Sequence, residues 1–459
     1  MSTKKNIDMT DMSKCFCYGC KEYDEYDKNK LADCEENLMP IAFALVFDGY
    51  ESVEELALGG YSGQELYGFN FSNQNLANAK FEDLSLSDSS FFKANLKNAD
   101  LSFSGLYGVD FEKADLSEAD LEYSSLDHAL FNGANMTGVQ LNKAVCVAAR
   151  FHYASMSNIQ APNSNLTACS FKQVNMSGAN FKKAKMIAVI FDECNMDGAN
   201  FKKAKLHAAV FSNVSMAGAN FSKADLQGAV FSETTLMGAD FSGATLVGIS
   251  LKEGSSLMSI KAPKAVFHDT CFSGGDLSGA DLRGANFQDA DLSETHLTCT
   301  DLSKANLSGA NLYGACMGAG RLNKANLYEA HLVGMLFSSG WAEDAIFESA
   351  NLENTEMECC HLKGSVFKDA KLIKTKLRES DMQGCVFIGA DLTDADLSKC
   401  DLTGADFSGA TMNGTNIEGA IITGCNWDGV DMSSIKGVGV VKSSIAANDA
   451  CVGDDDTDR

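Results

Sequence analysis

A large apolar residue returns at every fifth position over most of the chain, and this period constrains the fold more than any other feature. The series of Leu, Phe and Met runs from Leu66 to Leu251 and, after one extra residue within 252–256, resumes at Leu257 and continues to Met432. A small residue usually stands two places before each of these centres. A period of five fits neither the turn of an α-helix nor the alternation of a strand. The pattern therefore predicts a coil that turns a corner every five residues.

A second period of twenty residues lies on top of the first. The string Phe-Lys-Lys-Ala-Lys at Phe181 recurs at Phe201, and aromatic centres follow one another from Phe347 to Trp427 in steps of twenty. Four five-residue units thus make one turn of the coil. About 18 such turns, stacked at about 4.8 Å per turn, predict a rod about 86 Å long.

The unit itself has a recognisable form, Ala-(Asp/Asn)-Leu-x-x. It occurs as Ala114-Asp115-Leu116, Ala119-Asp120-Leu121, Ala280-Asp281-Leu282, Ala305-Asn306-Leu307 and Ala405-Asp406-Phe407. In this the chain resembles the pentapeptide-repeat family over roughly four-fifths of its length. The resemblance implies an all-β fold, a right-handed quadrilateral β-helix in which the centre residue and the small residue before it point inward. Each coil of such a solenoid is stabilised mainly by its two neighbours.

The repeats divide the chain into six parts, and the central solenoid is interrupted once. We predict a polar, cysteine-containing tail (1–35), a short helical cap (36–65), a first repeat segment (66–251), an irregular insertion (252–266), a second repeat segment (267–435), and a C-terminal cap with an acidic tail (436–459). Ala161-Pro162, the insertion with Pro263, and Trp341-Ala342 break the pattern locally. The first two are places where the rod could bend or extrude a loop.

Sixteen cysteines are present, and six of them stand at the inward small position: Cys169, Cys194, Cys360, Cys385, Cys400 and Cys425. We interpret these as buried small apolar residues. Cys360 and Cys400 lie two coils apart, about 9.6 Å, which is too far for a disulfide.

Four further cysteines, Cys15, Cys17, Cys20 and Cys34, form a Cys-x-Cys-x-x-Cys string followed by one more thiol. They are the candidate metal ligands, because thiolates bind zinc well and no histidine precedes His128. The alternative is a flexible tail with free thiols, since zinc sites usually pair two Cys-x-x-Cys knuckles and only Cys17 and Cys20 have that spacing.

No motif for catalysis is present. The chain has no Walker phosphate loop, no His-Glu-x-x-His and no Gly-x-Ser-x-Gly, and its seven histidines are dispersed. A shaft filled by its own side chains also offers no cleft for a substrate. We therefore expect a protein that is not an enzyme and uses no cofactor.

The charge balance limits the partners. The formal net charge is −25, so neither nucleic acid nor an anionic membrane is an expected partner, because both require clustered positive charge. No apolar run reaches the 18 to 20 residues of a membrane span, and the first thirty residues lack an apolar stretch of the signal-peptide type. We expect a cytoplasmic protein.

One segment departs from this acidity. Residues 151–250 carry a net charge of +2, while every other part of the chain is negative. In the twenty-residue frame seven lysines gather in adjacent coils: Lys182, Lys183, Lys185, Lys202, Lys203, Lys205 and Lys223. The stretch Lys371–Arg378 differs, because Glu356, Asp394 and Glu358 stack beside its cations. The seven lysines are thus a candidate protein-binding patch; the alternative is a solvated face balanced by Asp192, Glu193 and Asp197 around the corner.

The sequence favours a non-enzymatic scaffold, a rigid rod that binds a protein partner of unknown identity. The resemblance supplies an alternative of another class, since some pentapeptide-repeat proteins are acidic rods that mimic DNA and bind type II topoisomerases. A secreted effector that acts in a host cell is a further possibility. The oligomeric state is left open.

Overall fold

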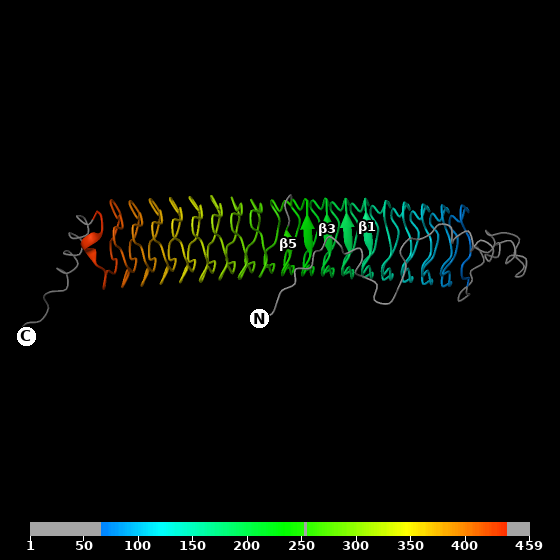
Figure 1. Cartoon of the computed structure of the whole chain (residues 1–459), viewed down its shortest axis with the longest axis horizontal. Helices are drawn as coiled ribbons and strands as arrows, with labels where there is room; N and C mark the ends of the chain where they lie inside the picture. The colour runs from blue at the N-terminus through cyan, green and yellow to red at the C-terminus, as the bar shows by residue number, and fades with distance from the viewer. Residues whose placement is uncertain (1–65, 252–254, 438–459) are drawn as a thin grey trace, which may run out of the picture.

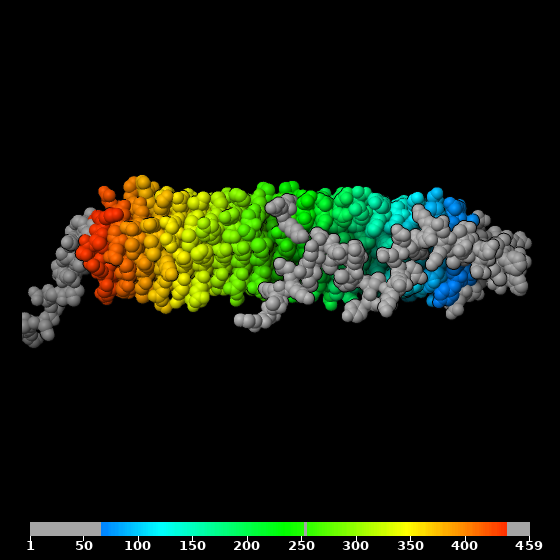
Figure 2. Space-filling model, viewed as in Figure 1, coloured from blue at the N-terminus to red at the C-terminus, as the bar shows by residue number. Residues whose placement is uncertain are grey.

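The computed structural model describes residues 66–251 and 255–437, which form one long, straight rod of stacked coils (Figures 1 and 2). Each coil pairs in parallel with the next through one backbone bridge on each of its four faces. Asp100, for example, is bridged to Asp120 and Asp120 to Gln140, at intervals of twenty. The predicted four-sided β-helix is therefore present. The tail predicted for 1–35, the helical cap predicted for 36–65 and most of the C-terminal cap and tail predicted for 436–459 lie outside the described residues.

On one face the bridges lengthen into short strands. These are β1 (Ser170–Lys172), β2 (Ile190–Asp192), β3 (Val210–Ser212), β4 (Val230–Ser232) and β5 (Ser250–Leu251), which form a parallel sheet in the order β1-β2-β3-β4-β5. β-branched residues at 190, 210 and 230 favour the extended backbone there. A 3-10 helix, η2 (Met432–Ser434), follows the last coil.

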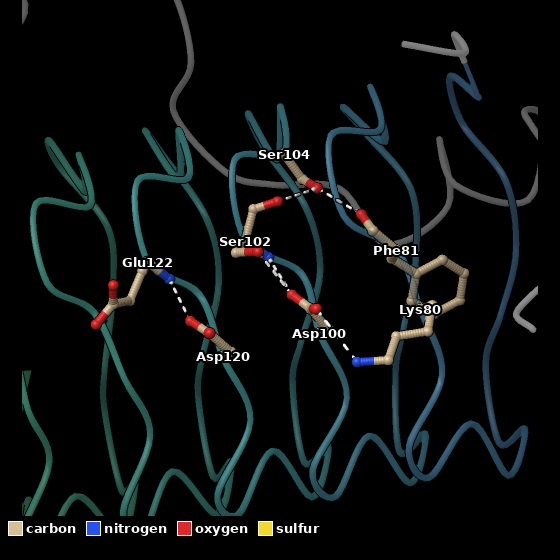
Figure 3. Close-up of polar contacts among 7 residues, drawn as sticks. All are labelled: Lys80, Phe81, Asp100, Ser102, Ser104, Asp120 and Glu122. Atoms are coloured by element: carbon tan, nitrogen blue, oxygen red, sulfur yellow. Dashed lines mark hydrogen bonds and ion pairs between the residues drawn. The ribbon is translucent and has the colours of Figure 1, made fainter. Parts of the chain in front are cut away.

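The corners explain the Asp or Asn of the repeat. Each corner places its third residue at positive φ, as at Lys183 (61°), and the N–H after it commonly bonds to the carbonyl of the centre residue. The carboxylate before the centre accepts the N–H two places ahead: the Oδ1 of Asp120 lies 2.9 Å from the nitrogen of Glu122 (Figure 3). An Asx-type bond of this kind stabilises a turn locally.

The interior is filled by two opposed columns of phenylalanine in the middle of the rod. Phe201 stacks on Phe221 with ring centroids 4.9 Å apart, and Phe211 stacks on Phe231 at 4.8 Å. The two columns meet edge to face, as for Phe211 and Phe221 at 6.4 Å. All four rings are fully buried. Offset stacks and edge contacts are the favourable geometries for aromatic pairs.

Polar atoms at the inward small position find partners in the preceding coil. The hydroxyl of Ser104 donates to the carbonyl of Phe81 at 2.6 Å (Figure 3), and the thiol of Cys385 donates to the carbonyl of Leu362 at 3.0 Å. All six predicted inward cysteines make this bond; five are buried and Cys425 is half-buried. Serine, threonine and cysteine are therefore tolerated among the alanines: these thiols are paired, and no buried side-chain nitrogen or oxygen of residues 66–251 and 255–437 lacks a hydrogen-bond partner.

The pattern breaks do not bend the described rod (Figure 1). Ala161 is fully buried, and Pro162 occupies the first corner position, which suits its fixed φ. Across the insertion the pairing interval changes from 20 to 21, with Thr235 bridged to Ser256, and residues 255–266 lie in regular coils. At the third break, Ala342 is buried and Trp341 lies outside, stacked on His361 at 5.4 Å.

Candidate protein-interaction surface

Each coil has four corners, which we name by one representative coil. Corner A holds residues 182–183, corner B 187–188, corner C 192–193 and corner D 197–198, together with the residues stacked above and below them. The face between corners A and B contains residue 185, and the face between D and A contains residue 180. Residue numbers in the second half of the rod are shifted by one because of the insertion.

The seven candidate lysines lie together along corner A and the adjoining A–B face. Lys185 is bridged to Lys205 in the next coil, and the N–H of Lys183 bonds to the carbonyl of Lys202 at 2.9 Å. All are exposed except Lys202, which is half-exposed. The backbone hydrogen bonds hold the lysine-bearing positions at the coil spacing, so the cations form rows along the rod.

None of these seven lysines is in an ion pair within the described residues. The acids weighed against them have other partners. Asp192 and Glu193 lie at corner C, where Lys172 approaches them at 3.0 and 3.9 Å. Asp197 accepts hydrogen bonds from the hydroxyl of Ser215 and the backbone N–H of residue 217.

In the comparison stretch Lys371–Arg378, only some of the ion pairs expected from the stacking of the coils are formed. Lys376 and Glu356 form an ion pair at 2.6 Å. Arg378, however, pairs with its neighbour Glu379 at 3.0 Å and not with the stacked Glu358. Lysines with direct acidic partners thus do occur on this rod, whereas the seven patch lysines have none among the residues that the structure describes.

The column of lysines at corner A extends beyond the seven candidate lysines. Continued across the insertion, it also contains Lys143, Lys264, Lys304 and Lys324, all exposed. Below Lys143 stand Tyr123 and Phe103, whose rings stack at 4.7 Å. The Nζ of Lys143 donates to the Tyr123 hydroxyl at 3.0 Å, and this bond raises the pKa of Lys143. Counting every twentieth residue, with one added at the insertion, would have found this column in the sequence.

The other candidate site falls outside the described residues: Cys15, Cys17, Cys20 and Cys34 all precede residue 66. Within residues 66–251 and 255–437, no group of three or more His, Cys, Asp or Glu side chains is arranged to hold a metal ion. In the same part of the chain, no helix is long and apolar enough to cross a membrane.

Two models of known protein families match this chain. The model for the pentapeptide repeat region matches residues 164–241 and 184–259, and the model for eight copies of the pentapeptide repeat matches 94–133, 114–145, 129–167, 285–319, 345–384 and 385–424. Together they cover more than half of the chain. The chain belongs to the pentapeptide-repeat family. Its fold is accordingly the right-handed, four-sided β-helix predicted from the repeat.

Several solved structures are similar to this pentapeptide-repeat protein. HetL, which is involved in heterocyst differentiation regulation in the cyanobacterium Nostoc, shares 25% identity over 51% of this chain and 90% of its own, with a TM-score of 0.20. A thylakoid-lumen protein of Arabidopsis thaliana shares 24% over 25% and 77%, with a TM-score of 0.23. QnrB1, a plasmid-mediated fluoroquinolone resistance protein, shares 19% over 55% and 90%, with a TM-score of 0.21. A sequence search of curated proteins finds no match.

Proposed function

We propose that this protein is a non-enzymatic scaffold, a rigid rod that binds an acidic protein partner through the lysine patch at corner A. The observation that carries the proposal is a set of seven stacked lysines that form no ion pair with any described residue, on a chain whose net charge is −25. Stacked like charges destabilise a sheet when nothing neutralises them. A partner that supplies carboxylates would relieve this repulsion.

The scaffold part of the proposal rests on how the interior is filled. Buried centre residues and small residues fill the interior of every complete coil of the described rod. The side chains that a partner can reach are therefore those on its outer surface. The histidines there are dispersed among separate contacts: His152 with Ser170, His207 with Asp225, and His361 with Trp341. This distribution supports binding more than catalysis, because acid–base chemistry requires convergent groups.

Capture of a partner from a cytoplasmic lysate by the full-length protein tests the proposal. Reversing the lysines at 182, 183, 202, 203 and 223 to glutamate is expected to abolish capture and to leave the melting temperature unchanged, because these side chains are largely exposed. Binding by the unaltered protein should weaken as salt is raised from 50 to 300 mM, since exposed charges are screened beyond about 10 Å at 0.1 M.

Two results would contradict the proposal. One is robust turnover by the purified rod in screens for hydrolase and transferase activity. The other is equal inhibition of gyrase supercoiling by the unaltered and the patch-reversed protein. That outcome would favour the DNA-mimic alternative, with which the net charge of −25 is compatible.

A further inference from the structure

Corner A carries a stripe of lysines that extends well beyond the seven candidate lysines. We define the corner-A stripe by the residues at its positive-φ position: Lys143, Lys183, Lys203, Lys223, Lys264, Lys304 and Lys324. Asn163, Gly243 and Gly284 interrupt it. Its densest part is the unbroken run from Lys183 to Lys223. The N–H of each of these three lysines is bonded to the next coil at 2.9 to 3.0 Å, so the run has a fixed spacing.

The surroundings of the dense part contain one acid, which lies at its far end. Residues 140–145, 160–165, 180–185, 200–205 and 220–225 form corner A and its two flanking faces over five coils, and they include eight lysines and a single acid, Asp225. On the D–A face an amide ladder runs beside the lysines: Asn180 donates to Gln160 at 3.0 Å, and Asn200 donates to Asn180 at 3.2 Å. The first acid on the A–B side, Asp225, is bonded to His207.

We infer that the corner-A stripe binds an acidic α-helix of the partner protein laid along the rod axis, an inference that rests on the function proposed above. The spacing of these lysines is close to the pitch of an α-helix. Successive lysines are about 4.8 Å apart, the spacing of parallel strands. One turn of an α-helix advances about 5.4 Å. A helix with one carboxylate per turn therefore drifts only about 1.2 Å from register between Lys183 and Lys223.

An extended peptide matches the stripe less well. Side chains on one side of a strand recur about every 6.6 Å, so an acidic strand drifts about 3.6 Å over the same three lysines. The column from Lys143 to Lys223, which itself contains no Asp or Glu, spans four coil steps, about 19 Å, which corresponds to about 13 helical residues. A helix of three to four turns is of ordinary length in proteins.

Nucleic acid is a poorer occupant of the same corner. The segments on both sides are acidic, with net charges of −5 over residues 66–150 and −9 over 351–459, and would repel a long polyanion. The aromatic pair at the start of the stripe also offers no stacking platform at Tyr123, because Phe103 covers one face of its ring and Lys143 lies over the ring at 4.8 Å. Both aromatic residues remain exposed, at 54% and 42%. Their edges suit apolar contacts with a protein.

The test measures binding of labelled probe peptides to the full-length protein by fluorescence anisotropy. The first probe is an alanine-rich helix of about 18 residues with glutamates on one face. The second has the same composition with glutamates around the whole helix, and the third contains two central prolines that abolish the helix. A single-stranded oligothymidylate of equal charge is the fourth. We expect the first probe to bind at least about tenfold more tightly than the other three.

Two triple variants locate the site. K183E/K203E/K223E is expected to bind the first probe, the helix with glutamates on one face, at least about tenfold more weakly than the unaltered protein does. K97E/K371E/K374E changes the net charge equally at exposed lysines on other corners and faces, none of them in an ion pair within the described residues, and should bind it like the unaltered protein. Thermal melts of both variants confirm that each is folded.

Equal affinity for all peptides, tightest binding of the oligonucleotide, or equal loss in both triple variants would overturn the inference. These failures are separable from failure of the proposed function. If capture of the lysate partner still depends on the patch while the peptides are not discriminated, the helix inference is wrong and the scaffold function stands. If the first probe binds as expected but no protein partner is captured, corner A does recognise an acidic helix and the proposed scaffold function is wrong.

Discussion

Replacing Phe387 with Asp is expected to lower the free energy of unfolding by about 4 kcal/mol or more. The ring is fully buried and stacks between Phe367 at 5.0 Å and Phe407 at 4.8 Å. The substitution removes both stacking contacts and places a carboxylate in an apolar column with no cation to pair with it. Burying an unpaired charge is among the few single changes that cost this much.

Ser398→Asp is the matched control. Ser398 lies at an outward corner position of the same coil, half-exposed, with Arg378 stacked on one side and Glu418 on the other. The same carboxylate there should change the free energy of unfolding by less than about 0.5 kcal/mol. Urea denaturation followed by far-UV circular dichroism compares the two variants. Equal losses would show that the inward and outward positions have been assigned to the wrong residues.

The buried thiols are expected to resist alkylation by about three orders of magnitude relative to exposed ones. Burial raises the pKa of Cys385 and of Cys400 to about 12, so only about one molecule in ten thousand holds either thiolate at pH 8. Cys271, Cys299 and Cys359 are exposed and serve as internal references. Pulsed labelling with iodoacetamide, followed by peptide mass spectrometry, gives a rate for each residue. Similar rates for both groups would contradict the burial.

The same shifts make stability dependent on alkaline pH. Because the folded-state pKa lies above the ordinary value of 9.0, the folded state retains its thiol protons where the unfolded state has lost them. The contribution is therefore intact below about pH 9 and is lost as the pH rises from there through about 12. Replacing Cys385 and Cys400 with alanine, the usual residue at this position, should make the fall in melting temperature above pH 9 less steep.

The inward half of this molecule could be predicted from the sequence because packing dictates it. Phe387 must point inward whichever rotamer it adopts. The five-residue period provides one inward position per corner for a large apolar side chain, and Phe387 occupies it. The same holds for the cysteines, which replace alanine at a fixed place and find the same carbonyl as serine does. The pattern also located the extra residue near 252–256, because the series resumes one place late.

Surface pairing could not be predicted in the same way. Column arithmetic placed Arg378 beside Glu358, yet its long side chain pairs with Glu379. Exposed ion pairs contribute about 0 to 1 kcal/mol, so several rotamers compete and stacking alone does not choose among them. The length of the corner-A stripe was accessible in principle, but the insertion hides it until the frame is shifted by one residue.

Lysine footprinting in the presence of the captured partner tests whether the partner binds along corner A. Each lysine is acetylated for a short time with and without the partner, and the change in rate is read peptide by peptide. We expect slower acetylation of Lys183, Lys203 and Lys223, with Lys97, Lys371 and Lys374 unchanged. Protection confined to other corners, or no protection along corner A while the partner is bound, would contradict this expectation.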